Sequence, residues 1–275
     1  MKNIMEMTWK EIDEVNKAKG ILCITVAPIE EHGLHLPLGT DIYEGEHWIK
    51  LLAEKMESKY GIECYKSIPF YTASASANYP CSVHFSPKTT KLAVYELIKN
   101  FASQGWKNII LIASHGDPIH QVAVSSACDE VNKQFGVCAI SPLSAFFSLG
   151  HNKIKFEVPE KIAKMESEFH DIHAGFVETS SMLCIKEELV KGIYKELPST
   201  VIDERQMGDG KKIIEAMGEY GHLGAPKYAD KAIGKELNEN FAKYLVDAVM
   251  AFIKRKNFQQ YEHHFLHDRL LGMIV

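Results

Sequence analysis

Short apolar runs alternate with longer segments of helical period in the first half of the chain. The apolar runs are typical of buried strands, and they cover residues 20–28, 62–70, 108–114 and 137–143. The segments between them repeat apolar residues at helical spacing and cover 40–61, 86–106 and 117–136. Strands that alternate with helices predict an α/β fold, in which two helical layers cover a mostly parallel central sheet.

Residues that favour helix ends support these boundaries. Thr40 or Asp41 is a suitable cap for the first helix, and Gly61 is suited to end it. Ser86 and Asp117 each precede a proline, which is a favoured way to begin a helix.

The second half shows the pattern less clearly. We predict a loop-rich region at 151–175, a helix that starts near Glu178, and a long helix with Pro226 in its first turn. The tail, 257–275, mixes aromatic and apolar residues, and we expect it to cover a neighbouring subunit. No repeat or linker divides the chain, so residues 1–275 are interpreted as one domain.

Composition excludes several classes of function. Hydrophobic residues make up 46% of the 275 residues and charged residues 24%, an ordinary globular balance. A net charge of −5 gives no support for nucleic-acid binding, and neither a signal peptide nor a membrane span is recognisable. The six cysteines are scattered without a CxxC pair, and we interpret them as reduced core thiols. We therefore expect a cytoplasmic protein that acts on a small molecule, without nucleic-acid or membrane partners.

Metal-capable side chains follow the first predicted strand. Glu30 and His32 are two residues apart, so in an extended segment they point to one side, and Asp41 stands at the start of the next helix. Carboxylate and imidazole ligands in this mixture suit zinc, manganese or iron. The alternative is that Asp41 only caps the helix and that the histidines are surface groups.

A second pair follows the strand at 108–114. His115 and Asp117 repeat the spacing of Glu30 and His32, and the carboxyl ends of parallel strands share one edge of a sheet. Two such pairs suit two divalent cations about 3.5–4 Å apart with a bridging carboxylate, for which Asp41 is the best candidate. The alternative for Asp117 is a helix cap.

The remaining histidines are candidates for different roles. His173 lies in a predicted loop and Glu178 at a helix start, which suits a general acid or base and its support, or simply a loop histidine and a first-turn glutamate. We interpret His222 as structural. The tail histidines, His263, His264 and His267, are interpreted as a surface cluster rather than a metal site.

Four motifs resemble those of the creatininase (creatinine amidohydrolase) family, in the same order along the chain. They are "EEHGLHLPLGTD" from Glu30, "ASHGDP" from Ala113, "HAGFVETS" from His173 and "GHLGAPKYA" from Gly221.

The resemblance implies a compact α/β/α domain, a dinuclear metal site with two divalent ions, and a homo-oligomer, usually a hexamer. It implies that Glu30 and His115 bind one ion and that His32 and Asp117 bind the other, while Asp41 bridges them. His173 would be the catalytic acid or base, and Glu178 would support the site.

The chain also departs from the family pattern. Asp117 stands where creatininases have glutamate, and "HFSPKTT" from His84 replaces an F-P-G-T segment. Creatininases enclose creatinine with tryptophans near the H-A-G loop, whereas Trp9, Trp48 and Trp106 all precede that loop here.

We therefore expect a metal-dependent hydrolase of a small polar cyclic amide or a related ring compound. The alternatives are ring opening of a keto-inositol of the 3-dehydro-scyllo-inosose type, deformylation of a formamide, and non-catalytic binding of a metal or ligand.

Overall fold

A parallel sheet forms the centre of the molecule. The computed structural model describes residues 1–71, 79–148, 160–203 and 210–274. Within them, five strands pair in the order β1-β3-β2-β4-β5, and every pairing is parallel. The strands are β1 (Lys2–Asn3), β2 (Ile21–Thr25), β3 (Cys64–Lys66), β4 (Asn108–Ile112) and β5 (Cys138–Ile140). The predicted α/β class with a parallel sheet is confirmed.

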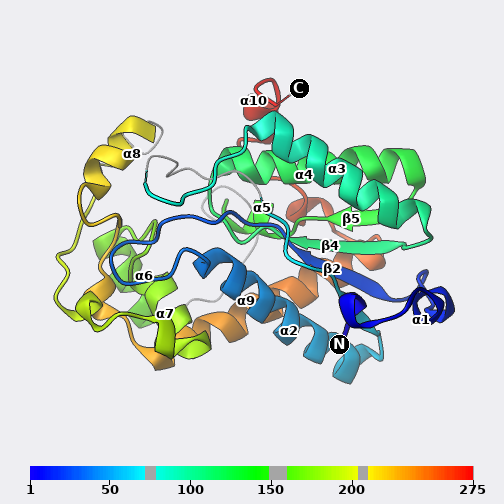
Figure 1. Cartoon of the computed structure of the whole chain (residues 1–275), viewed down its shortest axis with the longest axis horizontal. Helices are drawn as coiled ribbons and strands as arrows, with labels where there is room; N and C mark the ends of the chain where they lie inside the picture. The colour runs from blue at the N-terminus through cyan, green and yellow to red at the C-terminus, as the bar shows by residue number, and fades with distance from the viewer. Residues whose placement is uncertain (72–78, 149–159, 204–209, 275) are drawn as a thin grey trace.

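Helices cover both faces of this sheet (Figure 1). On one side lie α3 (Pro87–Ser103) and α4 (Pro118–Phe135); on the other lie α2 (Thr40–Tyr60) and α9 (Lys231–Ile253). Successive strand residues point to opposite faces. Ile21 and Cys23 thus pack with α2 and α9, whereas Leu22 and Ile24 pack with α3 and α4.

The remaining helices lie around this core. They are α1 (Trp9–Glu14), α5 (Leu143–Phe146), α6 (Glu160–Phe169), α7 (Phe176–Ile185), α8 (Gly210–Met217) and α10 (His267–Leu271). In Figure 1, α6, α7 and α8 gather at one end of the molecule, while α10 lies over α4.

Helix ends show which capping predictions hold. The hydroxyl of Ser86 accepts the backbone N–H of Thr89 at the start of α3, and Gly61 ends α2 in the left-handed conformation, with φ of 65°. The expected cap of α2 is wrong, because Gly39 occupies the cap position without a side-chain bond. Asp41 lies inside the first turn, where its carboxylate is available for other contacts.

Three other boundaries differ from expectation. Only Cys64–Lys66 of the segment 62–70 forms a strand, although the N–H of Phe70 still donates to the backbone oxygen of Thr25. In the region predicted to be loop-rich, α6 is a helix, and residues 151–159 lie outside the described part. The long helix α9 begins at Lys231, because the Asp230 side chain accepts two N–H groups there. Pro226 instead begins a separate 3-10 turn.

Cysteine burial partly matches expectation. All six cysteines are free thiols, and Cys23, Cys64, Cys128 and Cys138 are buried. Cys81 is exposed and Cys184 is half-buried, so these two are not core thiols. Among the helices of the described residues, none has the length and apolarity to cross a membrane.

Candidate metal centre

Three segments bring acidic and imidazole groups together beyond the strand ends. The loop after β2 carries Glu30 and His32, the first turn of α2 carries Asp41, and the loop after β4 carries His115. All four residues are buried. They meet because β2 and β4 are parallel neighbours, so the loops that follow them emerge at the same edge.

Asp41 lies between two groups of possible ligands. Its Oδ2 is 3.3 Å from Nδ1 of His115, and the same nitrogen is 3.0 Å from Oε2 of Glu30. Its Oδ1 is 3.2 Å from Nε2 of His32, which is 3.9 Å from Oε2 of Glu178. The two oxygens of one carboxylate therefore face different groups, an arrangement that suits a bridging ligand.

Asp117 lies outside both groups. The side chain is half-buried, and its Oδ1 accepts the backbone N–H groups of Ile119 and His120 at the start of α4. This is the capping role given above as the alternative. Glu178, from the first turn of α7, takes the place beside His32 that we had expected for Asp117.

His173 lies next to the second group and contacts a residue that sequence reasoning missed. Its ring centroid is 4.5 Å from that of His32. Its Nε2 is 2.8 Å from the backbone oxygen of Glu31 and 3.2 Å from Glu31 Oε1. Glu31 is buried, and its other oxygen accepts the N–H of Gly33. The adjacent acid in the motif "EEHG" was the available signal.

The H-A-G loop is held by Asp171. The Asp171 carboxylate accepts N–H groups from Phe176, Val177 and Ala225. A Cβ atom at Gly175 would lie 1.7 Å from Asp171 Oδ1, so only glycine fits there. Burial raises the pKa of Asp171 to about 7, although its three N–H partners lower it. Glu178 accepts the N–H of Ala174, so the same loop positions both His173 and Glu178.

Charge balance within the site depends on opposite partners. Burial raises the pKa of Glu30, but His115 and the other histidines outweigh it and hold that pKa well below its usual range. Burial likewise lowers the pKa of His32 and His115, but the neighbouring carboxylates raise both values well above normal. The pKa of Asp41 falls to about 2, because the same histidines outweigh its burial.

Glu44, one turn after Asp41 on α2, is a second residue that sequence reasoning missed. It is buried, and burial together with the charge of Glu178 raises its pKa well above normal. The spacing of three residues from Asp41 was the available signal.

The donor set fits divalent cations. Buried carboxylates this close together are costly unless positive charge lies among them. Oxygen and imidazole donors in this mixture suit zinc, manganese or iron. Oδ2 of Asp41, which faces His115, is also buried without a hydrogen-bond partner in the part of the chain that the structure describes.

Tryptophan residues belong to other parts of the molecule. Trp48 belongs to α2 and stacks on Phe241 of α9 in the core on that side of the sheet, and Trp106 packs in the core on the opposite face. Trp9 lies on α1 and is 75% exposed. An indole clamp of the kind used for creatinine is therefore not supplied by these three residues.

Comparison with known proteins now gives the family. The model of the family described as "Creatininase: Creatinine amidohydrolase" matches residues 5–249. The chain belongs to the creatininase family. It is also 25% identical over 268 residues to a 3-dehydro-scyllo-inosose hydrolase of Thermotoga maritima, covering 90% of this chain and 80% of the relative.

Solved creatininase structures share the fold. A tryptophan-to-phenylalanine mutant of creatininase has a TM-score of 0.71 at 19% identity, covering 91% of this chain and 98% of that one. A putative creatinine amidohydrolase from Bacteroides fragilis has a TM-score of 0.66 at 16% identity, covering 94% and 98%. A "Zn-Zn type" mutant creatininase and a "Creatininase Mn" are also similar; each covers 91% of this chain and 98% of the other at 19% identity, with TM-scores of 0.67 and 0.69.

Proposed function

We propose that the protein is a metal-dependent hydrolase that opens a small polar ring at a carbonyl group. The observation that carries this proposal is the position of Asp41, whose two carboxylate oxygens face two separate groups of ligands. Membership of the creatininase family supports hydrolysis as the class of reaction.

Two divalent ions would be held by the two groups. Glu30, Asp41 and His115 would bind one ion, and His32, Asp41 and Glu178 would bind the other. Such a pair supplies an activated water near neutral pH and polarises a carbonyl oxygen. Zinc, manganese and iron all suit these donors, and the names of two similar creatininases mention zinc and manganese.

His173 would move the proton that ring opening requires. Burial lowers its pKa, but the carboxylates of Glu31, Glu30 and Glu178 raise it above the usual value overall. A positioned imidazole is a suitable general acid for a leaving group. Glu31 would orient the imidazole through its backbone oxygen and its carboxylate.

A cyclic amide is the first candidate substrate. Water would add to the carbonyl carbon, the C–N bond would break, and His173 would protonate the departing nitrogen. The family description, creatinine amidohydrolase, names this reaction class.

A keto-cyclitol is the second candidate, and a specific observation favours it. The relative from Thermotoga maritima is named a 3-dehydro-scyllo-inosose hydrolase and matches 90% of this chain. The three tryptophans lie away from the candidate metal centre, so they give no support for creatinine itself as the substrate. In this reaction water would add to a ring ketone, the adjacent C–C bond would break, and His173 would protonate the carbon that leaves.

A substrate screen on metal-reconstituted protein tests the proposal. Chelated protein, reloaded separately with Zn²⁺, Mn²⁺ or Fe²⁺, should turn over cyclic amides or keto-cyclitols, and the chelated protein should not. If the protein turned over only linear formamides, the reaction would be deformylation and the ring-opening proposal would be wrong. Binding of ring compounds without turnover under every metal would contradict the hydrolase proposal. Reloaded His47→Ala protein should behave as wild type, because His47 is half-buried on α2 and belongs to neither group of possible ligands.

A further inference from the structure

A second cluster of metal-capable groups lies away from the metal centre, where the C-terminal tail meets α4. His263 and His267 belong to the tail, and Asp129 lies in α4. The tail histidines do not form the surface cluster that we expected from the sequence, because His264 and His267 are buried. Nε2 of His263 is 2.9 Å from Asp129 Oδ2, and Nε2 of His267 is 3.8 Å from the same oxygen. One donor atom from each of the three residues lies within 4.8 Å of the others.

A hydrogen bond joins only one of the two imidazoles to Asp129. The two imidazole rings stack with centroids 4.0 Å apart and an angle of 22° between planes. Nε2 of His263 is within hydrogen-bond distance of Asp129 Oδ2, whereas Nε2 of His267, at 3.8 Å, is too far away for such a bond. If Nε2 of His267 carries a lone pair, that lone pair and the Asp129 oxygen are two acceptors close together, and a cation between them would be attracted to both.

The far side of His267 favours a lone pair on Nε2. Its Nδ1 lies 3.2 Å from Oδ1 of Asp268, so the Nδ1–H can donate to that carboxylate. A carboxylate behind a histidine in this way orients the ring and fixes its tautomer in metal sites. Ser126 Oγ, 3.4 Å from Nε2 of His267, is the other polar neighbour of this nitrogen.

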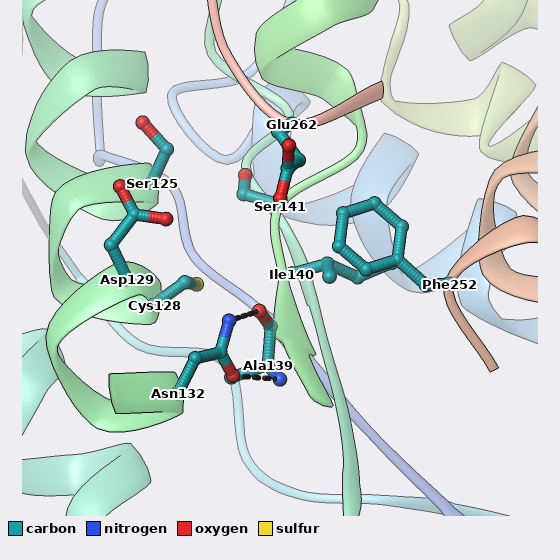
Figure 2. Close-up of a pocket in the computed structure, with 9 residues that line it drawn as sticks. All are labelled: Ser125, Cys128, Asp129, Asn132, Ala139, Ile140, Ser141, Phe252 and Glu262. Atoms are coloured by element: carbon teal, nitrogen blue, oxygen red, sulfur yellow. Dashed lines mark hydrogen bonds between the residues drawn. The ribbon is translucent and has the colours of Figure 1, made fainter. Parts of the chain in front are cut away.

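The sequence spacing and the surroundings agree with a metal site. His263 and His267 are four residues apart, which is a spacing common among histidine pairs that bind zinc. Figure 2 shows the adjoining pocket, with Asp129 and Ser125 of α4 on one side and Glu262 and Ser141 on the other. Glu262 adds a second carboxylate, which would increase the attraction for a cation. The Asp129 side chain is 44% exposed and that of His267 is 10% exposed, so an ion can enter from solvent.

We propose that Asp129, His263 and His267 bind a divalent cation of the Zn²⁺ class and thereby fasten the C-terminal tail to α4. Two neutral imidazoles and one carboxylate leave a fourth position for water, which is a common zinc environment. Apolar contacts act at the same junction, because Ile274 packs against Val122 and Ala123 of α4. The site is separate from the metal centre and does not depend on the function proposed above.

Metal counting on the full-length protein tests this site. Wild-type protein and the variants Asp129→Asn and His267→Ala would be dialysed against the same free Zn²⁺, and bound zinc would be measured by mass spectrometry. We expect each variant to bind one ion fewer per chain than wild type and to keep the other ions that wild type binds. His47→Ala protein should keep the wild-type count. Asparagine has nearly the same shape as aspartate, so Asp129→Asn should leave the packing of the tail intact. A lost ion in this variant would then not be caused by an unpacked tail.

Two further readouts decide between a bound ion and an ordinary ion pair. Added Zn²⁺ should raise the melting temperature of His47→Ala protein but raise it less in Asp129→Asn protein, because an ion that binds only the folded state stabilises it. Co²⁺ should give visible absorption, and both site variants should lose the share of it that comes from one ion per chain. Equal zinc counts in wild type and both variants, or loss of an ion in His47→Ala as well, would overturn the proposal. Neither result would bear on the metal centre, whose ligands are unchanged in all these variants.

Discussion

Asp41 is the residue at which the two ligand groups meet. It lies in the first turn of α2, with no role as the helix cap, and both of its oxygens face histidines. We propose that Asp41 contacts both ions and that the other ligands of each ion are the side chains close to one of its two oxygens. Glu178 lies beside His32, whereas Asp117 caps α4.

The assignment of Glu178 can be separated from that of Asp117 by two conservative substitutions. Glu178→Gln should weaken binding of one of the two ions at least about tenfold. Loss of a residue that only hydrogen-bonds to a metal ligand already weakens metal binding by about 10–100-fold, and loss of a ligand should cost at least as much. Asp117→Asn should keep both ions, because asparagine caps helices about as well as aspartate. Calorimetric metal titration measures both affinities. Loss of an ion in Asp117→Asn, with none in Glu178→Gln, would restore Asp117 as the ligand.

His173 should matter to catalysis more than to metal binding. His173→Ala should lower kcat by about 10²–10⁴ on the true substrate, because a positioned proton donor is lost. Steady-state kinetics on metal-loaded protein gives the value, and a metal count shows whether both ions remain. Undiminished kcat in this variant would remove His173 from the mechanism.

Glu31 should act through His173. Burial lowers the pKa of His173, and the Glu31 carboxylate is among the groups that raise it. Glu31→Gln should therefore lower that pKa and move the alkaline limb of the pH–kcat profile to lower pH. An unchanged limb, with only a general loss of activity, would make Glu31 a structural residue.

Sequence reasoning found the residues that motifs mark but missed those that depend on loop geometry. Glu30, His32, Asp41 and His115 lie together as predicted, because the order of strands and helices brings their loops to one edge. The contact between Glu31 and His173 spans 142 residues, and it depends on how two loops pack. The role of Asp117 depends on which of two possible partners its carboxylate meets, and in the structure it accepts the N–H groups of Ile119 and His120 at the start of α4.

At the scale of elements, the crossing of α7 and α9 supports the H-A-G loop. A Cβ atom on Gly234 of α9 would lie 1.8 Å from the backbone oxygen of Ser180 on α7. The two helices therefore pack with their backbones in close approach. Since α7 begins directly after the loop and carries Glu178, this contact helps to position Glu178 beside His32.

A single methyl group at this crossing should be costly. Gly234→Ala should lower the free energy of unfolding by about 1–3 kcal/mol, the usual effect of overpacking, and should also weaken metal binding. Gly192→Ala is a matched control, because a Cβ atom there meets nothing within 4 Å. Denaturant titration of both variants gives the two values. Equal stability in the two variants would mean that the crossing relaxes freely.

Helix and strand limits show where local signals are overridden. Pro226 is a good first-turn residue, yet α9 begins at Lys231 because Asp230 satisfies two N–H groups at that point. The apolar run 62–70 predicts a longer strand than the observed Cys64–Lys66. The strand is shorter because only these residues pair with β2 in a regular ladder. Strong periodicity predicted α2, α3 and α4 within a few residues, because amphipathic spacing and end signals agree there.

At the scale of the whole molecule, buried neutral histidines predict sensitivity to acid. His35 is buried against Thr179, with 2.8 Å between Nε2 and the hydroxyl oxygen. Burial, followed by the charges of nearby histidines, lowers its pKa to about 3. Below the usual pKa of 6.5, the unfolded chain takes up a proton that the folded chain excludes. Its contribution to stability is therefore lost as the pH falls from about 6.5 towards 3.

Substitution of His35 isolates this effect from other groups. Between pH 7 and pH 5, the free energy of unfolding should fall by about 1–2 kcal/mol less in His35→Gln than in wild type, since glutamine takes up no proton. Denaturant titration at the two pH values measures both differences. The same fall in both proteins would show that His35 is protonated as easily in the folded chain as in the unfolded one.

The central claim is that two cations share Asp41 at the edge of the sheet. Anomalous X-ray diffraction from crystals of zinc-loaded protein, recorded at the zinc edge, tests this most directly. We expect two anomalous peaks that both contact the Asp41 carboxylate, one beside Glu30 and His115 and the other beside His32 and Glu178. Absence of peaks at Asp41, or a single peak that only one of its oxygens contacts, would contradict it.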